Sequence, residues 1–366
     1  MINVLHLMNY INNGGAEKYI ISLAEKLQGK KCRFYVGVSK RTNNIFENQL
    51  EELGVKIIIL PIKSLYDLGA IINIKRFCKA NEIGIIHTHF LRENCVSTLS
   101  RLLGNKVKVI NTCHMNWRNI KSVQLINRLI TKLNYKIIAV SNSVKEILVE
   151  EGIKKDRIEI IYNGVDYDFY QEKEISSLNR EFNLDKDTFK VVTIARFNEE
   201  KGHTYLLDII EELQNKIDIE KFKFILVGDG ELKADIEDIA KNKGIDKHII
   251  FTGVRRDIKN ILYGADLYIS PSKNEALGLS ILEAMACGVP IIATDVGGTS
   301  EILGKENEFL VNYGDTKKAC NDIIEIFNNE GNIKEKVILN GKNRIKSIFN
   351  LETMSQKTYN LYEHDN

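Results

Sequence analysis

The sequence predicts an α/β fold in which two Rossmann-like domains, each a doubly wound parallel sheet, face each other across a cleft. The first observation behind this prediction is a regular alternation of short β-branched runs with longer amphipathic segments, which is typical of βα units on parallel sheets. The second is length, because 366 residues are long for one hydrophobic core and suit two domains of roughly 150–200 residues each.

The first domain is expected over residues 1–166. Its strand candidates are short apolar, β-branched runs at residues 3–7, 33–38, 55–60, 85–87, 107–111, 136–140 and 158–161. Apolar residues at helical spacing fill the gaps, for example at residues 16–27, 68–80 and 142–151. The run Asn163-Gly164-Val165-Asp166 closes the domain.

The second domain is expected over residues 167–348. Its strand candidates lie at residues 190–195, 224–228, 249–252, 267–270, 290–294 and 309–311. Residues 349–366 are expected to form a C-terminal helix that packs back towards the first domain. Ligands of such sheets bind beyond the carboxyl ends of the strands, so functional residues are expected in the loops that follow them.

Charge is unevenly distributed, although the net charge is only +2. Residues 1–166 carry 25 Lys and Arg against 14 Asp and Glu, whereas the remainder carries 26 against 35. The basic half and the acidic half are therefore expected to meet different partners. Nucleic acid is not an expected partner, because no aromatic-rich stacking platform or binding motif accompanies the basic residues.

Cysteine usage indicates a reduced, cytoplasmic environment. The six cysteines are scattered and form no C-x-x-C pair, so neither disulfides nor a zinc site are expected. Residues 1–8 are apolar but lack a basic leader and a cleavage site, which indicates a first strand rather than a signal peptide. No apolar run approaches the ~18–20 residues that are needed to cross a bilayer.

Residues 270–298 hold the most informative pattern of the chain. Seven residues separate two carboxylates, Glu275 and Glu283; the first is expected in a strand-to-helix loop and the second on the helix that follows. The start of that helix, at Gly278 and Leu279, presents unpaired backbone N–H groups and a positive dipole end, which suit phosphate. Carboxylates beside a phosphate site suit hydroxyl recognition, because they accept hydrogen bonds from sugars and ribose.

A cationic pair follows another predicted strand. Residues 194–202 read I-A-R-F-N-E-E-K-G, which puts Arg196 at the strand end and Lys201 five residues later. A guanidinium fork and a mobile ammonium together fit a diphosphate leaving group. Two solvated loop cations are the alternative.

Glycines mark further strand ends. Asn13-Gly14-Gly15-Ala16-Glu17 follows the first strand and is not G-x-G-x-x-G, so an NAD or FAD enzyme is disfavoured. A Gly pair still lets the backbone approach a ligand closely at a helix start. Gly228 and Val254 end two strands of the second half, where glycine leaves room for a planar base. An ordinary turn remains the alternative at each glycine.

Taken together, these motifs resemble the retaining GT-B glycosyltransferases of family 4 (group 1), of the type that assembles bacterial surface glycans. The resemblance runs from Gly14 to Gly298 and is most specific in the second half. It implies transfer of a hexose or N-acetylhexosamine from a nucleoside-diphosphate sugar, with a UDP-sugar favoured, to a hydroxyl, with retention of anomeric configuration. Cationic side chains replace the divalent metal of other glycosyltransferase folds, so no cofactor is expected.

The resemblance also implies roles for the donor-binding residues. Arg196, Lys201 and the amides at Gly278 and Leu279 would stabilise the departing diphosphate. Glu275 would orient the sugar ring and Glu283 would bind the ribose hydroxyls, with the nucleobase near Val254. Ala276-Leu277 stands where many relatives carry Gly-Phe or Ser-Phe, which leaves the identity of the donor sugar open.

In the first domain the resemblance implies that His114 hydrogen-bonds to the transferred sugar. It also implies that the Gly14-Gly15 loop lies against the donor phosphate. His87 and His89 are expected to shape the cleft. His-x-His could indicate a metal, but no third ligand stands at a convincing spacing, so no metal is expected.

Residues 118–136 contain five basic residues and no acidic one. Their apolar residues recur at near-helical spacing: Val123, Leu125, Ile126, Leu129, Ile130 and Leu133. Such a helix can lie on an anionic membrane surface or can be a packed helix with a solvated basic face. The basic first domain favours the membrane, and predicts peripheral association with the inner face of the cell membrane and a lipid-linked saccharide acceptor.

Two other functions stay open on the sequence alone. The same fold serves nucleotide-sugar epimerases, which need no acceptor, and a non-catalytic nucleotide-sugar-binding subunit would also retain a donor site. The cationic pair together with the two glutamates favours transfer over both.

Overall fold

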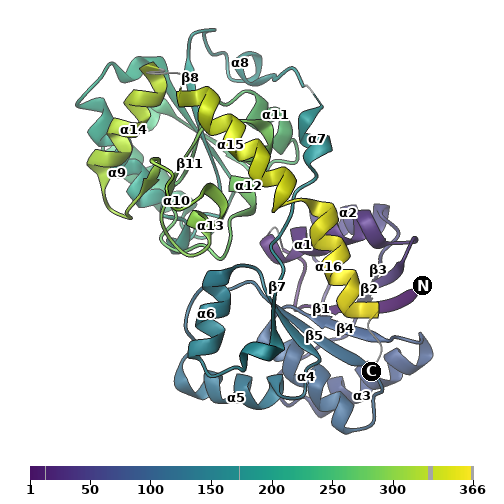
Figure 1. The fold of residues 1–366 in the computed structure, drawn as a ribbon. Helices are drawn as coiled ribbons and strands as arrows, with labels where there is room; N and C mark the ends of the chain where they lie inside the picture. The colour runs from purple at the N-terminus through teal and green to yellow at the C-terminus, as the bar shows by residue number, and fades with distance from the viewer. Residues whose placement is uncertain (13, 173, 329–332, 364–366) are drawn as a thin grey trace. The chain divides into compact units, whose positions relative to one another are not determined.

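The computed structural model describes residues 1–12, 14–172, 174–328 and 333–363. The chain divides into two compact units: Met1–Asn163 with Leu351–Asn366, and Gly164–Asn350 (Figure 1). Each unit has its own parallel sheet covered by helices, which confirms the predicted α/β class. Every predicted strand overlaps a strand of the structure.

The sheet of the first unit has the order β3-β2-β1-β4-β5-β6-β7, and its strands are parallel throughout. Its strands are β1 (Ile2–Leu7), β2 (Cys32–Val38), β3 (Lys56–Ile59), β4 (Ile85–Thr88), β5 (Lys108–Cys113), β6 (Lys136–Ala139) and β7 (Ile158–Ile160). The chain builds outward from β1 to β3 and then returns, placing β4 on the other side of β1. The point where the strand order reverses therefore lies between β1 and β4.

The helices of the first unit are α1 (Gly15–Leu27), α2 (Ile45–Glu52), α3 (Leu68–Ala80), α4 (Leu91–Leu102), α5 (Lys121–Thr131), α6 (Asn142–Glu150) and α16 (Leu351–Glu363). Strand β1 shows how they cover both faces of the sheet. Val4 belongs to a core cluster with α1 and α16, whereas its neighbour Leu5 belongs to a second cluster with α3. Because successive strand residues point to opposite faces, a strand buried on both faces reads as one apolar run.

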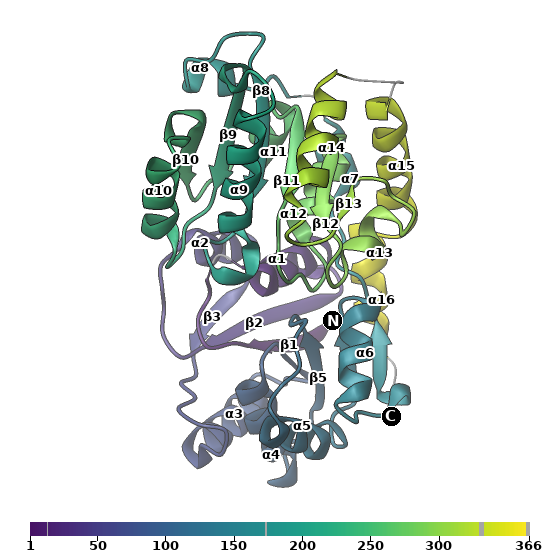
Figure 2. The same ribbon diagram turned by 90° about the vertical axis from the view of Figure 1, so that its left-hand side faces the viewer.

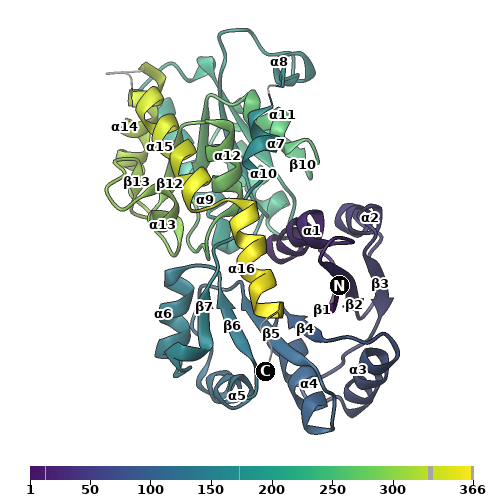
Figure 3. The same ribbon diagram turned by 45° about the vertical axis from the view of Figure 1, so that its right-hand side comes forward.

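The C-terminal helix α16 completes the core of the first unit. It packs against α1 (Figure 3). Leu351, Met354, Leu361 and Tyr362 are buried in the same cluster as Tyr19 of α1. The chain therefore leaves the first unit at Asn163 and re-enters it at Leu351.

The sheet of the second unit has the order β10-β9-β8-β11-β12-β13 and is also parallel. Its strands are β8 (Phe189–Ile194), β9 (Phe222–Val227), β10 (Ile249–Gly253), β11 (Leu267–Ser270), β12 (Ile291–Thr294) and β13 (Leu310–Val311). The reversal of strand order here lies between β8 and β11.

The α-helices of the second unit are α7 (Tyr167–Gln171), α8 (Leu178–Glu181), α9 (His203–Gln214), α10 (Lys233–Asn242), α11 (Ile258–Tyr263), α12 (Leu279–Cys287), α13 (Thr299–Leu303), α14 (Thr316–Asn328) and α15 (Ile333–Ser347). Helices α9 and α14 contact each other and cover one face of the sheet (Figure 2). None of the helices in the described part of the chain is both long and apolar enough to cross a membrane.

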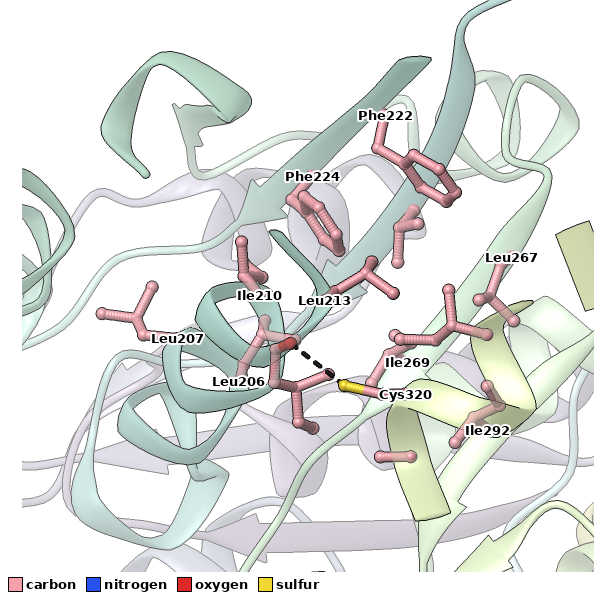
Figure 4. Packing of buried hydrophobic residues seen from close by; sticks show 14 of the residues in the cluster. Leu206, Leu207, Ile210, Leu213, Phe222, Phe224, Leu267, Ile269, Ile292 and Cys320 are labelled. Carbon is pink, nitrogen blue, oxygen red and sulfur yellow. Dashed lines mark hydrogen bonds between the residues drawn. The ribbon is translucent and has the colours of Figure 1, made fainter. Parts of the chain in front are cut away.

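Figure 4 shows the core beneath α9. Leu206, Ile210 and Leu213 pack against Phe222 and Phe224 of β9 and against the neighbouring strands. On the α14 side, the Cys320 thiol donates a hydrogen bond to the Ile209 carbonyl at 3.3 Å. This thiol and the other five are free cysteines.

Truncating Leu213 tests this core. The side chain is fully buried, so Leu213→Ala leaves a cavity and should cost about 2–5 kcal/mol of unfolding free energy. Leu339→Ala is the control, because Leu339 lies on α15 of the same unit and is 61% exposed. Urea denaturation followed by circular dichroism measures both. Equal stability of the two variants would contradict the packing described here.

Candidate functional site

The predicted donor-binding residues gather where the strand order of the second unit reverses. The loop after β8 carries Arg196 and Lys201, and the loop after β11 carries Glu275. Parallel α/β sheets bind ligands beyond the carboxyl ends of the strands at such a reversal, because the two connections diverge there. The sequence motifs therefore converge on one edge of one sheet.

Backbone contacts tie the two loops together. The amides of Lys273 and Asn274 donate to the Glu200 carbonyl at 2.8 and 3.2 Å. Gly202 has a positive φ of 65°, and a Cβ there would lie 1.9 Å from the carbonyl oxygen of Pro271. Only glycine fits at position 202, so its absence of a side chain lets the loops approach.

Lys201 and Glu275 form an ion pair. The Nζ–Oε2 distance is 2.6 Å, and the two side chains are 24% and 13% exposed. Lys201 lies in a 3-10 turn, Glu199–Lys201, that precedes α9 rather than on α9 itself. Each partner is thus the counterion of the other, within reach of solvent.

Arg196 stands two residues beyond the end of β8 and is exposed. Within the described residues, no hydrogen bond or ion pair engages its guanidinium. A planar fork of donors is therefore available at the same edge for a phosphate group.

Helix α12 begins at this edge as well. Gly278 is its N-cap, with φ 103° and no side-chain cap, and its carbonyl accepts from the amides of Ile281 and Leu282. In the described part of the chain the amides of Leu279 and Ser280 have no backbone acceptor, so they can meet an anion. A Cβ on Gly278 would lie 2.8 Å from Ile281 Cδ1 and 3.4 Å from Glu275 Cγ.

Glu283 lies one helical turn further along α12 and is buried. The hydroxyl of Tyr170, on α7, donates to Glu283 Oε1 at 3.1 Å. The Tyr170 carbonyl in turn accepts from the Tyr263 hydroxyl at 2.7 Å. Sequence reasoning missed Tyr170, which stands 113 residues from its partner and carries no local motif.

Gly228 and Val254 directly follow β9 and β10, on the side of β8 away from β11. Gly228 donates its amide to the Gly253 carbonyl at 2.9 Å. Its φ is 141°, and a Cβ there would lie 2.0 Å from the Ala195 carbonyl oxygen. Packing against the loop after β8 therefore requires glycine at 228, while Val254 is 41% exposed.

In the first unit the predicted residues gather at the other reversal of strand order, between β1 and β4. Gly14 is the N-cap of α1 in an extended conformation without a side-chain cap, and Gly15 begins the helix. The buried Glu17 carboxylate accepts from the Asn12 amide at 2.9 Å, which ties the loop after β1 to the helix. Asn13 lies outside the described residues.

His114 follows β5 and belongs to a cluster of four histidines. Nδ1 of His6, on β1, lies 3.1 Å from Nε2 of His89, and Nδ1 of His89 lies 3.1 Å from Nε2 of His114. His87 instead bonds to two hydroxyls at 2.6 Å, through Nδ1 to Tyr362 of α16 and through Nε2 to Thr112.

His87 and His89, which are expected to shape the cleft, are shielded from solvent within their own unit. They are 0% and 1% exposed, on the sheet face that α1 and α16 cover. The rings of Tyr19 and Tyr362 pack edge-on against them. His114 is only partly buried and is the accessible end of the cluster.

Burial keeps these imidazoles neutral. It lowers the pKa of His6 and of His114 to about 3. It also holds the pKa of His87 and His89 well below 6.5, and the neighbouring imidazoles lower it further. In the second unit, burial and the nearby Lys201 lower the pKa of His203 to about 4.

His6, His87 and His89 hold nitrogens within 4.8 Å of one another, close enough to suggest a metal centre. Both nitrogens of His87 and both nitrogens of His89 are already engaged in hydrogen bonds. Among the described residues, only His6 Nε2 of this trio lacks a partner. The geometry is therefore that of a hydrogen-bond network, which a cation would have to disrupt.

Two family models match the chain in succession. Residues 13–169 match the model described as glycosyltransferase family 4, and residues 174–344 match glycosyl transferases group 1. The chain is a group 1, family 4 glycosyltransferase.

Curated relatives of this glycosyltransferase share about a quarter of its residues. It is 25% identical over 333 residues to N-acetyl-alpha-D-glucosaminyl L-malate synthase of Bacillus anthracis, covering 88% of this chain and 86% of that protein. It is 26% identical over 318 residues to UDP-Gal:alpha-D-GlcNAc-diphosphoundecaprenol alpha-1,3-galactosyltransferase of Escherichia coli, covering 82% and 80%.

A solved structure shows the same GT-B fold. HepE of Anabaena, in complex with UDP-glucose, superposes with a TM-score of 0.84 at 21% identity, over 98% of this chain and 99% of HepE. The predicted GT-B architecture is thereby confirmed.

Acid should destabilise this glycosyltransferase through its buried histidines. Their pKa is depressed in the folded state, so their imidazoles bind protons near pH 6.5 in the unfolded chain but stay neutral there in the folded chain. The contribution of these histidines to the free energy of unfolding is therefore fully present above about pH 6.5. It falls as the pH drops towards the folded-state pKa values, by up to about 1.4 kcal/mol per pH unit for each histidine.

Urea titrations between pH 5 and 7, above the range of most carboxyl groups, measure this slope. His203→Phe, which retains a ring against Phe197, should make the slope shallower by one histidine's share. An unfolding free energy that does not change over this interval would contradict the burial argument.

Proposed function

We propose that this glycosyltransferase transfers a hexose or N-acetylhexosamine from a nucleoside-diphosphate sugar, with a UDP-sugar favoured, to a hydroxyl of a lipid-linked saccharide. The reaction retains anomeric configuration and serves cell-surface polysaccharide assembly at the inner face of the cytoplasmic membrane. The observation that carries the proposal is the Lys201–Glu275 ion pair beside the exposed Arg196, where the strand order reverses.

The cations of this edge suit a leaving diphosphate. As the bond between the sugar C1 and the diphosphate oxygen breaks, negative charge grows on the phosphates, and preorganised donors stabilise that charge. Arg196 offers a bidentate fork, Lys201 a point charge, and the start of α12 offers the amides of Leu279 and Ser280. Such a donor set supplies the stabilisation that a divalent metal supplies elsewhere, so transfer should proceed without metal.

Glu275 has two successive partners in this scheme. It neutralises Lys201 in the ligand-free protein. When a diphosphate takes Lys201, the carboxylate is released and can accept hydrogen bonds from sugar hydroxyls, which orients the ring. Donor binding would thereby replace the Lys201–Glu275 ion pair with a Lys201–diphosphate ion pair, so that Lys201 keeps a counterion.

Retention follows if the acceptor oxygen attacks C1 on the face that the diphosphate leaves. The C1–O bond to the diphosphate breaks, the C1–O bond to the acceptor forms, and the acceptor proton passes to the departing phosphate oxygen. Glu283, held by Tyr170, would accept from the ribose hydroxyls, and the base would lie near Val254. In the first unit, the Gly14-Gly15 loop would contact a donor phosphate, and His114 would bind a sugar oxygen of the substrate.

A lipid-linked acceptor is supported by the exposed face of α5. Leu125 and Leu129 of α5, and Leu133 in the turn that follows it, stand four residues apart and are 57%, 55% and 39% exposed. Lys121 precedes these leucines and Lys132 stands next to Leu133; both lysines are exposed, and α5 contains no acidic residue. Ile130 of the predicted apolar face is instead buried against the unit. An apolar ridge between lysines fits an anionic bilayer surface.

The relatives illustrate both kinds of acceptor. The Escherichia coli relative is named for a diphosphoundecaprenol-linked substrate, and the Bacillus anthracis relative for malate, a small acid. The ridge on α5 favours the lipid-linked class for this chain, since a soluble acceptor needs no membrane surface.

The donor site is tested by incubating purified protein, in chelator, with a panel of nucleotide-sugars and a bacterial lipid extract. Lipid-dependent release of nucleoside diphosphate is expected in the wild type. Lys201→Met and Glu275→Gln should each lower kcat/KM roughly 10²–10³-fold. The double variant should be about as impaired as either single one, because the two residues act as a unit.

Lys241→Met is the matched control, since Lys241 is 63% exposed on α10 of the same unit, and it should keep full activity. An intact nucleotide that carries an altered sugar would show an epimerase instead. Binding of the nucleotide-sugar without turnover would show a non-catalytic subunit.

The α5 surface is tested by sedimentation with vesicles of phosphatidylglycerol and phosphatidylcholine. Leu125→Gln/Leu129→Gln should weaken binding to the anionic vesicles roughly tenfold or more, because apolar burial is lost. Leu68→Gln/Ile72→Gln removes an exposed apolar pair at the same spacing on α3 and should have no effect. Equal binding of both variants to the vesicles would contradict a membrane-binding role of α5 and would favour a water-soluble acceptor.

A further inference from the structure

Three of the four histidines form a continuous chain of hydrogen bonds through the first unit. It runs from His6 Nδ1 to His89 Nε2, and from His89 Nδ1 to His114 Nε2, with both nitrogen–nitrogen distances at 3.1 Å. His6 and His89 are buried, and His114 is the partly exposed end. These hydrogen bonds therefore connect the interior of the unit to one accessible imidazole, that of His114.

A neutral imidazole has one N–H donor and one acceptor nitrogen. His89 uses both nitrogens within the chain, so it donates to one neighbour and accepts from the other. All donors must then point the same way, either outward to His114 or inward to His6. The tautomer of each ring is fixed by that single choice.

The buried end decides the direction. Nε2 of His6 is shielded from solvent and has no partner among the described residues. If the donors point inward, this atom is a buried N–H without an acceptor, which is the rarer kind of unsatisfied group in native proteins. If they point outward, it is only an unused lone pair.

We propose that His6 and His89 are positioning residues that hold His114 as the Nδ1–H tautomer, with its Nε2 accepting from His89. His114 then presents an N–H donor through Nδ1, which has no partner in the part of the chain that the structure describes. Its ligand is an oxygen with an available lone pair, such as a sugar hydroxyl, ring oxygen or acetamido carbonyl. This last step rests on the proposed function, whereas the tautomer does not.

His87 is not part of this chain of hydrogen bonds, although its ring lies against the rings of His6 and His89. Its nitrogens are held by the hydroxyls of Tyr362 and Thr112. Hydroxyls can donate or accept, so His87 imposes no direction on the chain.

The tautomers can be observed directly in ligand-free, full-length protein labelled with ¹⁵N-histidine. Long-range ¹H–¹⁵N spectra at pH 7 distinguish Nδ1–H from Nε2–H rings, and single-residue variants assign the seven histidines. We expect Nδ1–H for His6, His89 and His114. An Nε2–H signal for His114, or fast exchange between both forms, would overturn the proposal.

Removing the inner donor tests the positioning role. His6→Phe should release His114 into a mixture of tautomers and lower kcat/KM roughly threefold to tenfold, the effect of one hydrogen bond. His203→Phe, a change of the same kind in the second unit, should leave the His114 signal as it is. If His114 keeps a single Nδ1–H tautomer in His6→Phe, His6 has no positioning role.

The two proposals can fail independently. Wild-type protein that transfers no sugar but shows the Nδ1–H tautomer of His114 would refute the proposed glycosyl transfer and support the proposed direction of the histidine hydrogen bonds. Active protein with His114 as the Nε2–H tautomer would support the proposed transfer and refute the proposed direction of the hydrogen bonds. If His6→Phe does not fold, the wild-type spectrum still decides the direction of the chain.

Discussion

The reversal of strand order in each parallel sheet is the constraint on which the rest of this structure depends. Parallel strands need crossover connections, and these leave the sheet in opposite directions on the two sides of β1 and of β8. The carboxyl ends of β1 and β4, and of β8 and β11, therefore stay open between diverging loops. Polar side chains from the strand-end loops can meet there, whereas the strands themselves are buried on both faces.

Charge at the second of these edges is balanced before any ligand arrives. Lys201 and Glu275 are held in partly buried positions, and loops that require glycine at 202 and 278 bring them together. An unpaired ammonium or carboxylate in this position would carry a desolvation cost. Pairing them offsets that cost in the ligand-free unit, while Arg196 is exposed and has no counterion among the described residues.

Much of this arrangement could be predicted from the sequence because its signals are local. The strands are continuous apolar runs, Arg196, Lys201 and Glu275 stand in loops that follow strand ends, and Glu283 stands at a fixed spacing from Glu275 on the next helix. Tyr170 and Tyr362 could not be found in this way, since each meets its partner across more than a hundred residues. His6 carries no local motif either, and its partner His89 stands 83 residues away in the sequence.

The burial of His87 and His89 could not be predicted either, for a different reason. A strand-end His-x-His pattern shows that both side chains point to the same face, but it does not show what covers that face. Here the cover includes α16, which comes from the far end of the sequence.

That placement of α16 has a consequence for how the chain folds during synthesis. The first 163 residues leave the ribosome first, yet their core lacks Met354, Leu361 and Tyr362, and His87 lacks a hydrogen-bond partner, until α16 has been made. Domains of large proteins usually fold in order from the N-terminus. In this chain the second unit can finish first, while the surface of the first unit that α16 covers stays exposed and His87 lacks the hydroxyl of Tyr362. Chaperones that shield apolar surface would be needed longer by the first unit than by the second, because the first unit is completed last.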